Sequence, residues 1–253
     1  MTSQIHDSKK SGAYKSAFIT VLGRPNVGKS SLVNKICGEK IAITSNKPQT
    51  TRHKIRGVLH RSDAQLVFVD TPGIHKPQTK LGERLNTKAV STLSEIDIVC
   101  FVVDATSPIG AGDKFIAEKL GPETIVLVNK CDKAKKPQIA ERLIEASSFN
   151  FSEYFPVSAK SGEGLPALIE HLFGLTQEGP MFYPAEQVTD MSDRDYVAEL
   201  VREQLLRIMQ KEIPHSIATR VTEWEWPRIR IAVSYTHLRA HETVLDLVCR
   251  LLL

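Results

Sequence analysis

The sequence predicts an α/β fold with a mostly parallel sheet flanked by helices, followed by an incomplete α+β domain. Short runs rich in Val, Ile and Leu alternate with amphipathic stretches, the pattern of a parallel sheet with helical crossovers. The apolar runs that predict strands lie at 17–23, 66–70, 97–105, 124–129 and 154–159. The amphipathic stretches that predict helices lie near 83–94, 113–120, 137–147 and 165–173.

One segment departs from this alternation. Residues 52–70 contain two extended pieces joined by the polar turn Arg61-Ser62-Asp63, which predicts an antiparallel hairpin.

The chain divides into a tail, a first domain, a linker and a second domain. We expect a poorly ordered tail over 1–15, the first domain over 16–175, and a Gly/Pro-containing linker over 176–192. A helix capped by Ser192 then presents one apolar face and ends before Pro214. Two strands follow at 216–226 and 228–233.

Composition places the chain among globular proteins. It has 253 residues, 42% hydrophobic and 25% charged, with a net charge of +4. This mild excess permits contact with RNA or an anionic membrane but demands neither. The four cysteines form no CxxC or metal-ligand pattern, and neither a signal peptide nor a run of ~20 apolar residues is present. We therefore expect a cytoplasmic protein.

A phosphate-binding loop is the strongest motif. The segment GRPNVGKS (23–30) fits GxxxxGK[ST] between a predicted strand and a predicted helix. Its backbone N–H groups and the helix N-terminus suit a β-phosphate, Lys29 suits the β- and γ-phosphates, and Ser30 suits Mg²⁺. The predicted nucleotide-binding residues here are Gly23, Arg24, Pro25, Asn26, Val27, Gly28, Lys29, Ser30 and Ser31.

Two further segments predict metal and γ-phosphate contacts. Asp70 ends an apolar strand, where open α/β sheets bind ligands, and we assign it to Mg²⁺, through water. Thr71, Pro72 and Gly73 follow, and the Gly73 N–H suits the γ-phosphate. In PQTTRHK (48–54), either Thr50 or Thr51 suits Mg²⁺, and the sequence does not choose between them. The predicted metal ligands are Ser30, Thr50, Thr51 and Asp70, and the predicted catalytic residues are Lys29, Thr50, Thr51 and Gly73.

The purine is predicted to be guanine. Asn129-Lys130-Cys131-Asp132 follows a strand, and the Asp132 carboxylate can accept hydrogen bonds from guanine N1–H and its amino group. Adenine would leave this carboxylate unpaired. We expect Lys130 to lay its stem over the base and Asn129 to tie this loop to the phosphate loop. After a further strand, Ser158, Ala159 and Lys160 complete the site, with the Ala159 N–H directed at guanine O6.

Ile74 occupies the position at which Ras-like proteins usually carry a water-orienting glutamine. We therefore expect slow basal hydrolysis, or hydrolysis that depends on another group or a cation. Asn26 could help to bind K⁺ beside the β- and γ-phosphates, which is a hypothesis.

The motifs together resemble the Era family of bacterial ribosome-assembly GTPases. The resemblance is carried by GRPNVGKS, TSNKPQTTRHKIRG, FVDTPGIHKP, NKCD, VSAKSGEG and the linker from Gly179, and it runs from about Ser16 to about Ala232. It implies a P-loop GTPase domain over 16–175 that binds GTP or GDP with Mg²⁺, and a KH domain that binds 16S rRNA of the 30S subunit. It also implies a monomer with peripheral contact to the inner membrane.

The C-terminal part departs from that family. A KH domain clamps nucleic acid with a Gly-x-x-Gly loop, but the last glycine is Gly179. Residues 193–232 therefore predict only the first helix and two strands of that domain, with RNA binding impaired or absent. Residues 233–253 resemble translated sequencing adapter, and we expect them to be non-native.

Two alternatives stay open beside a GTPase in 30S assembly and 16S rRNA maturation. One is an RNA-binding nucleotide sensor with negligible hydrolysis, which Ile74 favours. The other is an Era-like GTPase with another RNA target.

Overall fold

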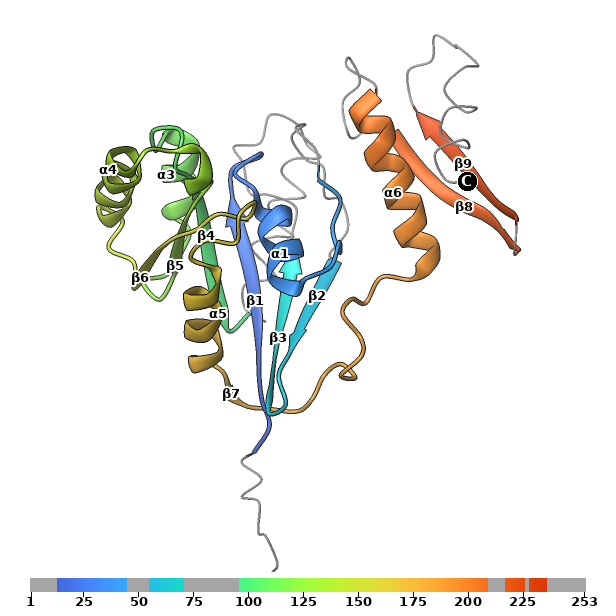
Figure 1. The fold of residues 1–253 in the computed structure, drawn as a ribbon, viewed down its shortest axis with the longest axis horizontal. Helices are drawn as coiled ribbons and strands as arrows, with labels where there is room; N and C mark the ends of the chain where they lie inside the picture. Colours follow the sequence, from blue (N-terminus) through green and yellow to red (C-terminus); the bar gives the residue numbers. More distant parts are fainter. Residues whose placement is uncertain (1–12, 45–54, 71–95, 209–216, 226–227, 236–253) are drawn as a thin grey trace, which may run out of the picture.

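The computed structural model describes residues 13–44, 55–70, 96–208, 217–225 and 228–235 of the chain. In this part, seven strands form one sheet, six of them in the order β2-β3-β1-β4-β5-β6 (Figure 1). The seventh, β7, pairs with the amino-terminal end of β1, on the side of β1 opposite to β3. The strands are β1 (Lys15–Gly23), β2 (Ile55–His60), β3 (Ala64–Asp70), β4 (Ile98–Asp104), β5 (Ile125–Asn129), β6 (Glu153–Pro156) and β7 (Gln177–Glu178).

The five strands β3, β1, β4, β5 and β6 run parallel, as the alternating pattern predicts. β2 pairs antiparallel to β3, and the turn between them is closed by a 2.7 Å hydrogen bond from Arg61 N–H to Ala64 O. The predicted hairpin is therefore confirmed. Parallel strands end at one edge of the sheet, so the residues that follow β1, β4 and β5 meet there.

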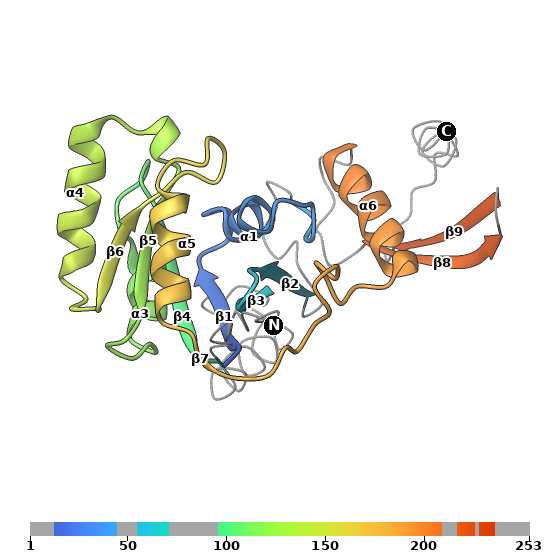
Figure 2. The ribbon, with the colours of Figure 1, turned by 60° about the horizontal axis from the view of Figure 1, so that its bottom comes forward.

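Helices cover both faces of the sheet (Figures 1 and 2). Buried residues of α1 (Lys29–Cys37) and α5 (Leu165–Gly174) share one apolar cluster with alternate residues of the central strands. The other face carries α3 (Ala111–Ala117) and α4 (Lys136–Ser147), which share a second cluster with Leu22, Phe101 and Val126. Since the central strands are buried on both faces, their runs read as continuous Val/Ile/Leu.

The predicted linker lies along the first domain. β7 pairs antiparallel with the start of β1, and the Val58 N–H donates to Val188 O at 2.9 Å on the outer edge of β2. Between these points Gln65, fully buried, accepts hydrogen bonds from the N–H groups of Phe182 (2.8 Å) and Tyr183 (3.2 Å). The linker thus covers the open edge of β2 and supplies a short strand that periodicity does not predict.

A helix and a two-stranded antiparallel sheet follow. They are α6 (Asp193–Ile208), β8 (Ile217–Glu225) and β9 (Arg228–Tyr235). The cap predicted at Ser192 is confirmed: its Oγ accepts from the Asp195 N–H at 3.2 Å and donates to the Asp195 carboxylate at 2.6 Å. The pairing between β8 and β9 extends to Tyr235. It therefore includes residues 233–235, which lie in the segment that we expect to be non-native.

One buried carboxylate joins α6 to the first domain. Glu203, with a fully buried side chain, accepts from the Lys40 ammonium and from the Thr44 N–H (3.0 Å) and hydroxyl (3.1 Å). Although burial alone would raise the pKa of Glu203, these hydrogen bonds outweigh it and hold that pKa below its usual range. α6 is therefore fixed to the segment that follows α1.

Some predicted boundaries shift. The helix expected near 113–120 spans 111–117, and the strand expected at 154–159 ends at Pro156, where residues 157–164 turn into α5 instead. The helix expected near 83–94 and the stop at Pro214 lie outside the described residues. Within the described ranges, no helix has the length and apolar character needed to cross a bilayer.

Candidate functional site

The phosphate loop joins β1 to α1 at the carboxyl edge of the sheet. Its backbone turns left-handed at Asn26 (φ 65°) and Gly28 (φ 100°). A Cβ atom on Gly28 would lie 2.4 Å from the Asn129 side-chain nitrogen, so only glycine fits at this point. The N-cap residue of α1 is Gly28, which has no side chain to act as a cap, and the first turn carries no acidic residue. These N-terminal amides suit an anion such as a phosphate.

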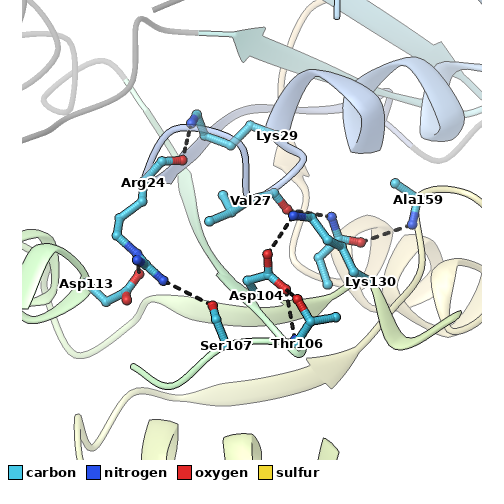
Figure 3. Close-up of polar contacts among 10 residues, drawn as sticks. Arg24, Val27, Lys29, Asp104, Thr106, Ser107, Asp113, Lys130 and Ala159 are labelled. Carbon is cyan, nitrogen blue, oxygen red and sulfur yellow. Dashed lines mark hydrogen bonds and ion pairs between the residues drawn. The ribbon is translucent and has the colours of Figure 1, made fainter. Parts of the chain in front are cut away.

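Lys29 lies folded over this loop. Its ammonium donates to Gly23 O at 3.0 Å. It also donates to Arg24 O at 2.8 Å (Figure 3). The cation is therefore held beside the N-terminal amides of α1, where both favour a negatively charged ligand.

Arg24 contributes its backbone to the loop and turns its side chain away from it. The guanidinium pairs with the buried Asp113 at 2.7 Å and contacts Ser107 Oγ at 3.5 Å (Figure 3). The other Asp113 oxygen accepts from the Gly110 N–H at 3.0 Å, at the start of α3. The phosphate loop is therefore anchored to α3, a role that the sequence does not predict for either residue.

Asn129, the last residue of β5 and 1% exposed, joins three segments of the site. Its amide NH₂ donates to Val27 O at 2.8 Å, which is the tie to the phosphate loop that we predicted. Its amide oxygen accepts from the Ala159 N–H at 3.0 Å (Figure 3). The Ala159 N–H, predicted to face guanine O6, thus bonds to Asn129 in this structure, and its contact with a base stays a prediction.

Asp132 is exposed and oriented by its neighbour across the loop. The Ser158 hydroxyl donates to the Asp132 carboxylate at 2.7 Å. Ser158 itself is buried and accepts from the N–H groups of Lys160 (3.2 Å) and Ser161 (3.1 Å). The segments 129–132 and 158–161 are therefore hydrogen-bonded to each other and present the Asp132 carboxylate to solvent.

Lys130 bonds to a residue that the sequence analysis did not single out. Its ammonium lies 2.5 Å from the carboxylate of Asp104, the last residue of β4. Burial alone would raise the pKa of Asp104, but hydrogen bonds from Lys130 and Thr106 hold that pKa below its usual range. The available signal was its position, since Asp104 ends an apolar strand as Asp70 does.

The metal side of the site is described in part. Ser30 and Ser31 lie in the first turn of α1, and the backbone of Asp70 ends β3, beside β1. Thr50, Thr51, Thr71, Pro72, Gly73 and Ile74 lie outside the described residues, so their assignments stay predictions. In the part of the chain that the structure covers, no three His, Cys, Asp or Glu side chains are grouped so that they could hold a metal ion. A hydroxyl and one carboxylate beside phosphate oxygens fit Mg²⁺, which keeps several waters and few protein ligands.

An open depression of about 290 Å³ adjoins the same loops. It is lined by Ser31, Asn34, Lys35, Glu39, Lys40, Thr44 and Ala159. Since Ser31 and Ala159 are predicted nucleotide residues, we treat this hollow as the flank of one site rather than as a second site.

Comparison with known proteins agrees with this geometry. Residues 18–130 match the family described as 50S ribosome-binding GTPase. The chain is 46% identical over 217 residues to GTPase Era of Corynebacterium diphtheriae, covering 83% of this chain and 71% of that protein. It is also 46% identical over 215 residues to GTPase Era of Alkaliphilus metalliredigens, covering 83% and 72%.

Two solved structures are similar over the same extent. One is Era in complex with MgGDPNP and nucleotides 1506–1542 of 16S ribosomal RNA, and the other is a variant of Aquifex aeolicus Era bound to GDP and AlF4⁻. Each is 33% identical, with a TM-score of 0.77, and covers 83% of this chain and 73% of the other. The fold is thus the P-loop GTPase fold followed by part of a KH-like domain, and this chain belongs to the Era family of GTPases.

Proposed function

We propose that this protein is a GTP-binding and GTP-hydrolysing switch that acts in 30S-subunit assembly and 16S rRNA maturation. The observation that carries the proposal is the Asn129 amide, which joins the phosphate loop at Val27 to residues 158–160 at Ala159. We call residues 158–160 the base loop. A ligand that spans both loops would place a phosphate chain at the first loop and the rest of the molecule at the second. A guanine nucleotide has this shape.

The phosphate end is bound by backbone and cation. The N-terminal amides of α1 and the Lys29 ammonium would hold the β- and γ-phosphates. Ser30 would hold Mg²⁺ together with Asp70 and one of Thr50 and Thr51. A bound Mg²⁺ neutralises charge on the phosphate oxygens. The related Era structure contains MgGDPNP, which supports the same nucleotide and metal here.

The base end distinguishes guanine from adenine. Asp132, oriented by Ser158, would accept from guanine N1–H and its amino group. Adenine places an acceptor at N1 and has no 2-amino group, so it would meet the carboxylate with repulsion. A site built on such hydrogen bonds rejects the wrong ligand strongly.

Hydrolysis of GTP to GDP and phosphate is the reaction of the family to which the chain belongs. Ile74 in place of glutamine leaves water orientation to another group. We propose slow basal turnover that K⁺ stimulates through Asn26. The alternative, an RNA-binding sensor with negligible hydrolysis, rests on the same isoleucine.

The proposed RNA partner is 16S rRNA in the 30S subunit. Support comes from the related Era structure, which contains nucleotides 1506–1542 of that RNA. Because this chain lacks the Gly-x-x-Gly clamp, we propose weak RNA binding by the sequence as given. We further propose a cytoplasmic monomer with peripheral contact to the inner membrane, and an Era-like GTPase with another RNA target as the alternative.

The test is nucleotide binding and turnover by the purified chain. GTP and GDP should bind and ATP should not, while Lys29→Ala and Asp132→Ala should each abolish GTP uptake. Phosphate release should be measurable, faster in K⁺ than in Na⁺, and recorded with and without a 16S rRNA 3′ fragment. Equal uptake of ATP and GTP would refute the proposal. GTP uptake without any release would favour the sensor, and unchanged turnover in Na⁺ would remove the role of Asn26.

A further inference from the structure

Lys130 has a backbone conformation that lysine rarely adopts. Its φ of 70° and ψ of 31° place it in the left-handed region. For a non-glycine residue this conformation costs on the order of 1 kcal/mol, and it persists where surrounding contacts impose it. The neighbouring contacts are backbone hydrogen bonds, from Cys131 N–H to Val157 O at 3.2 Å and from Lys133 N–H to Lys130 O at 2.9 Å. The turn therefore fixes where the Lys130 side chain starts.

Asp104 fixes where that side chain ends. Its carboxylate, on a side chain 12% exposed, lies 2.5 Å from the Lys130 ammonium. The other carboxylate oxygen accepts from the Thr106 N–H at 2.8 Å and from the Thr106 hydroxyl at 2.6 Å. Figure 3 shows Lys130 extended toward Asp104 beside the phosphate loop. The Asp104 carboxylate is thus itself held in place by Thr106, unlike the acceptor of an incidental surface ion pair.

The backbone places the two residues in register. Asp104 in β4 pairs directly with Asn129 in β5, and the Ala105 N–H donates to Asn129 O at 2.8 Å. Lys130 is the next residue after Asn129. With its start and its end both fixed, the methylene chain of Lys130 has little freedom to move. The methylene chain thus presents a preorganised apolar surface between the Lys130 backbone and the ammonium.

We infer that Asp104 is a positioning residue of the nucleotide site: by holding the Lys130 ammonium it sets the methylene chain of Lys130 as one wall against the purine ring. This inference rests on the proposed function and deepens it. A methylene wall contacts the face of a base and not its hydrogen-bonding edge. Asp104 should therefore set affinity for every purine nucleotide that the site accepts, without changing which purine it prefers.

The test compares Asp104→Asn with a matched control, Glu145→Gln. Like Asp104, Glu145 accepts from a backbone N–H, that of Ile109 at 3.0 Å, and from a cation, Arg142 at 2.8 Å. It lies on α4, and neither of these two partners is a predicted nucleotide residue. Dissociation constants for GDP, GTP and inosine triphosphate are measured for wild type and both variants, with urea unfolding of each.

Asp104→Asn should weaken binding of all three nucleotides about ten-fold, a loss of ~1.4 kcal/mol, and keep the GTP-to-inosine-triphosphate ratio of wild type. Glu145→Gln should lose stability but keep affinity. In a Lys130→Met background, which retains the apolar chain and removes the ammonium, Asp104→Asn should have no further effect on affinity. That background also tests the pair if Asp104→Asn alone does not fold.

Undiminished affinity in folded Asp104→Asn would overturn the inference, as would an equal loss in Glu145→Gln or a changed base ratio. These results differ from failure of the proposed function, in which the wild-type chain itself would not prefer GTP to ATP.

Discussion

Replacing Asn129 with alanine tests the join between the phosphate loop and the base loop. The side chain is 1% exposed and makes two hydrogen bonds, to Val27 O at 2.8 Å and from Ala159 N–H at 3.0 Å. Each such bond contributes about 1 kcal/mol net, and a buried partner left unpaired adds about 1–3 kcal/mol. Because Ala159 is only half-buried, water can replace part of its bond. We therefore expect Asn129→Ala to lose about 2–4 kcal/mol, or roughly 5–12 °C in Tm.

The loss should appear in two assays, thermal unfolding of the nucleotide-free chain and titration with a fluorescent GDP. Gln65→Ala is the matched control, since this fully buried amide also bonds to backbone groups, those of Phe182 and Tyr183. Gln65 lies in the amino-terminal half of β3, away from the carboxyl edge that forms the site. Gln65→Ala should lose comparable stability and keep GDP affinity, whereas Asn129→Ala should lose both.

Two results would refute this reasoning. Asn129→Ala could unfold within ~0.5 kcal/mol of wild type, which would mean that the two bonds contribute nothing net. Alternatively, both variants could lose GDP affinity equally, which would mean that general destabilisation and not the join sets binding.

Three further predictions concern other parts of the molecule. Gly28→Ala places a Cβ atom 2.4 Å from the Asn129 side-chain nitrogen at a φ of +100°, so GDP titration should show binding weakened at least ten-fold; wild-type affinity would mean that neither the close contact nor the backbone strain matters for binding. Arg24→Ala leaves Asp113 buried without its cation, so urea unfolding should show a loss of about 2–4 kcal/mol, and removing both charges should lose less than the sum of the single changes; additive losses would contradict the pairing. Because the pKa of Glu203 is lowered in the folded protein, the stabilisation that its charge contributes is complete above the usual glutamate range and is lost as the pH falls through the lowered pKa. The free energy of unfolding, measured with urea from pH 7 to 3, should therefore fall less steeply in Glu203→Gln than in wild type, and equal slopes would contradict this.

Local sequence was sufficient for features that depend on neighbours along the chain. The phosphate loop at 23–30 needs glycine at position 28, where the backbone is left-handed and Asn129 lies close, and Ser192 needs only the next turn of helix to act as a cap. The strands at 97–105 and 124–129 were found within one or two residues because burial on both faces demands continuous apolar runs. Boundaries were less exact where tertiary contacts end an element, as at Pro156.

Contacts between distant segments could not be found in this way. Lys130 meets Asp104 across 26 residues, Arg24 meets Asp113 across 89, and Lys40 meets Glu203 across 163. Each partner is an ordinary charged residue in its own neighbourhood, and only strand order and register make them adjacent. The strand β7 is similar, since two polar residues show no periodicity and pair with β1 only because the chain returns to it.

The sequence alone therefore determined the α/β class, the phosphate loop, and the order of the two segments that we predict to contact the base, because turn chemistry and burial patterns are written in adjacent residues. Tertiary structure decided which side chains hold those segments in place. It brought Asp104, Asp113 and Glu203 to their cations, and it seated the linker on the edge of β2. The physical reason is that a buried charge or an open strand edge must find a partner, and the folded backbone, not the local sequence, determines which partner lies within reach.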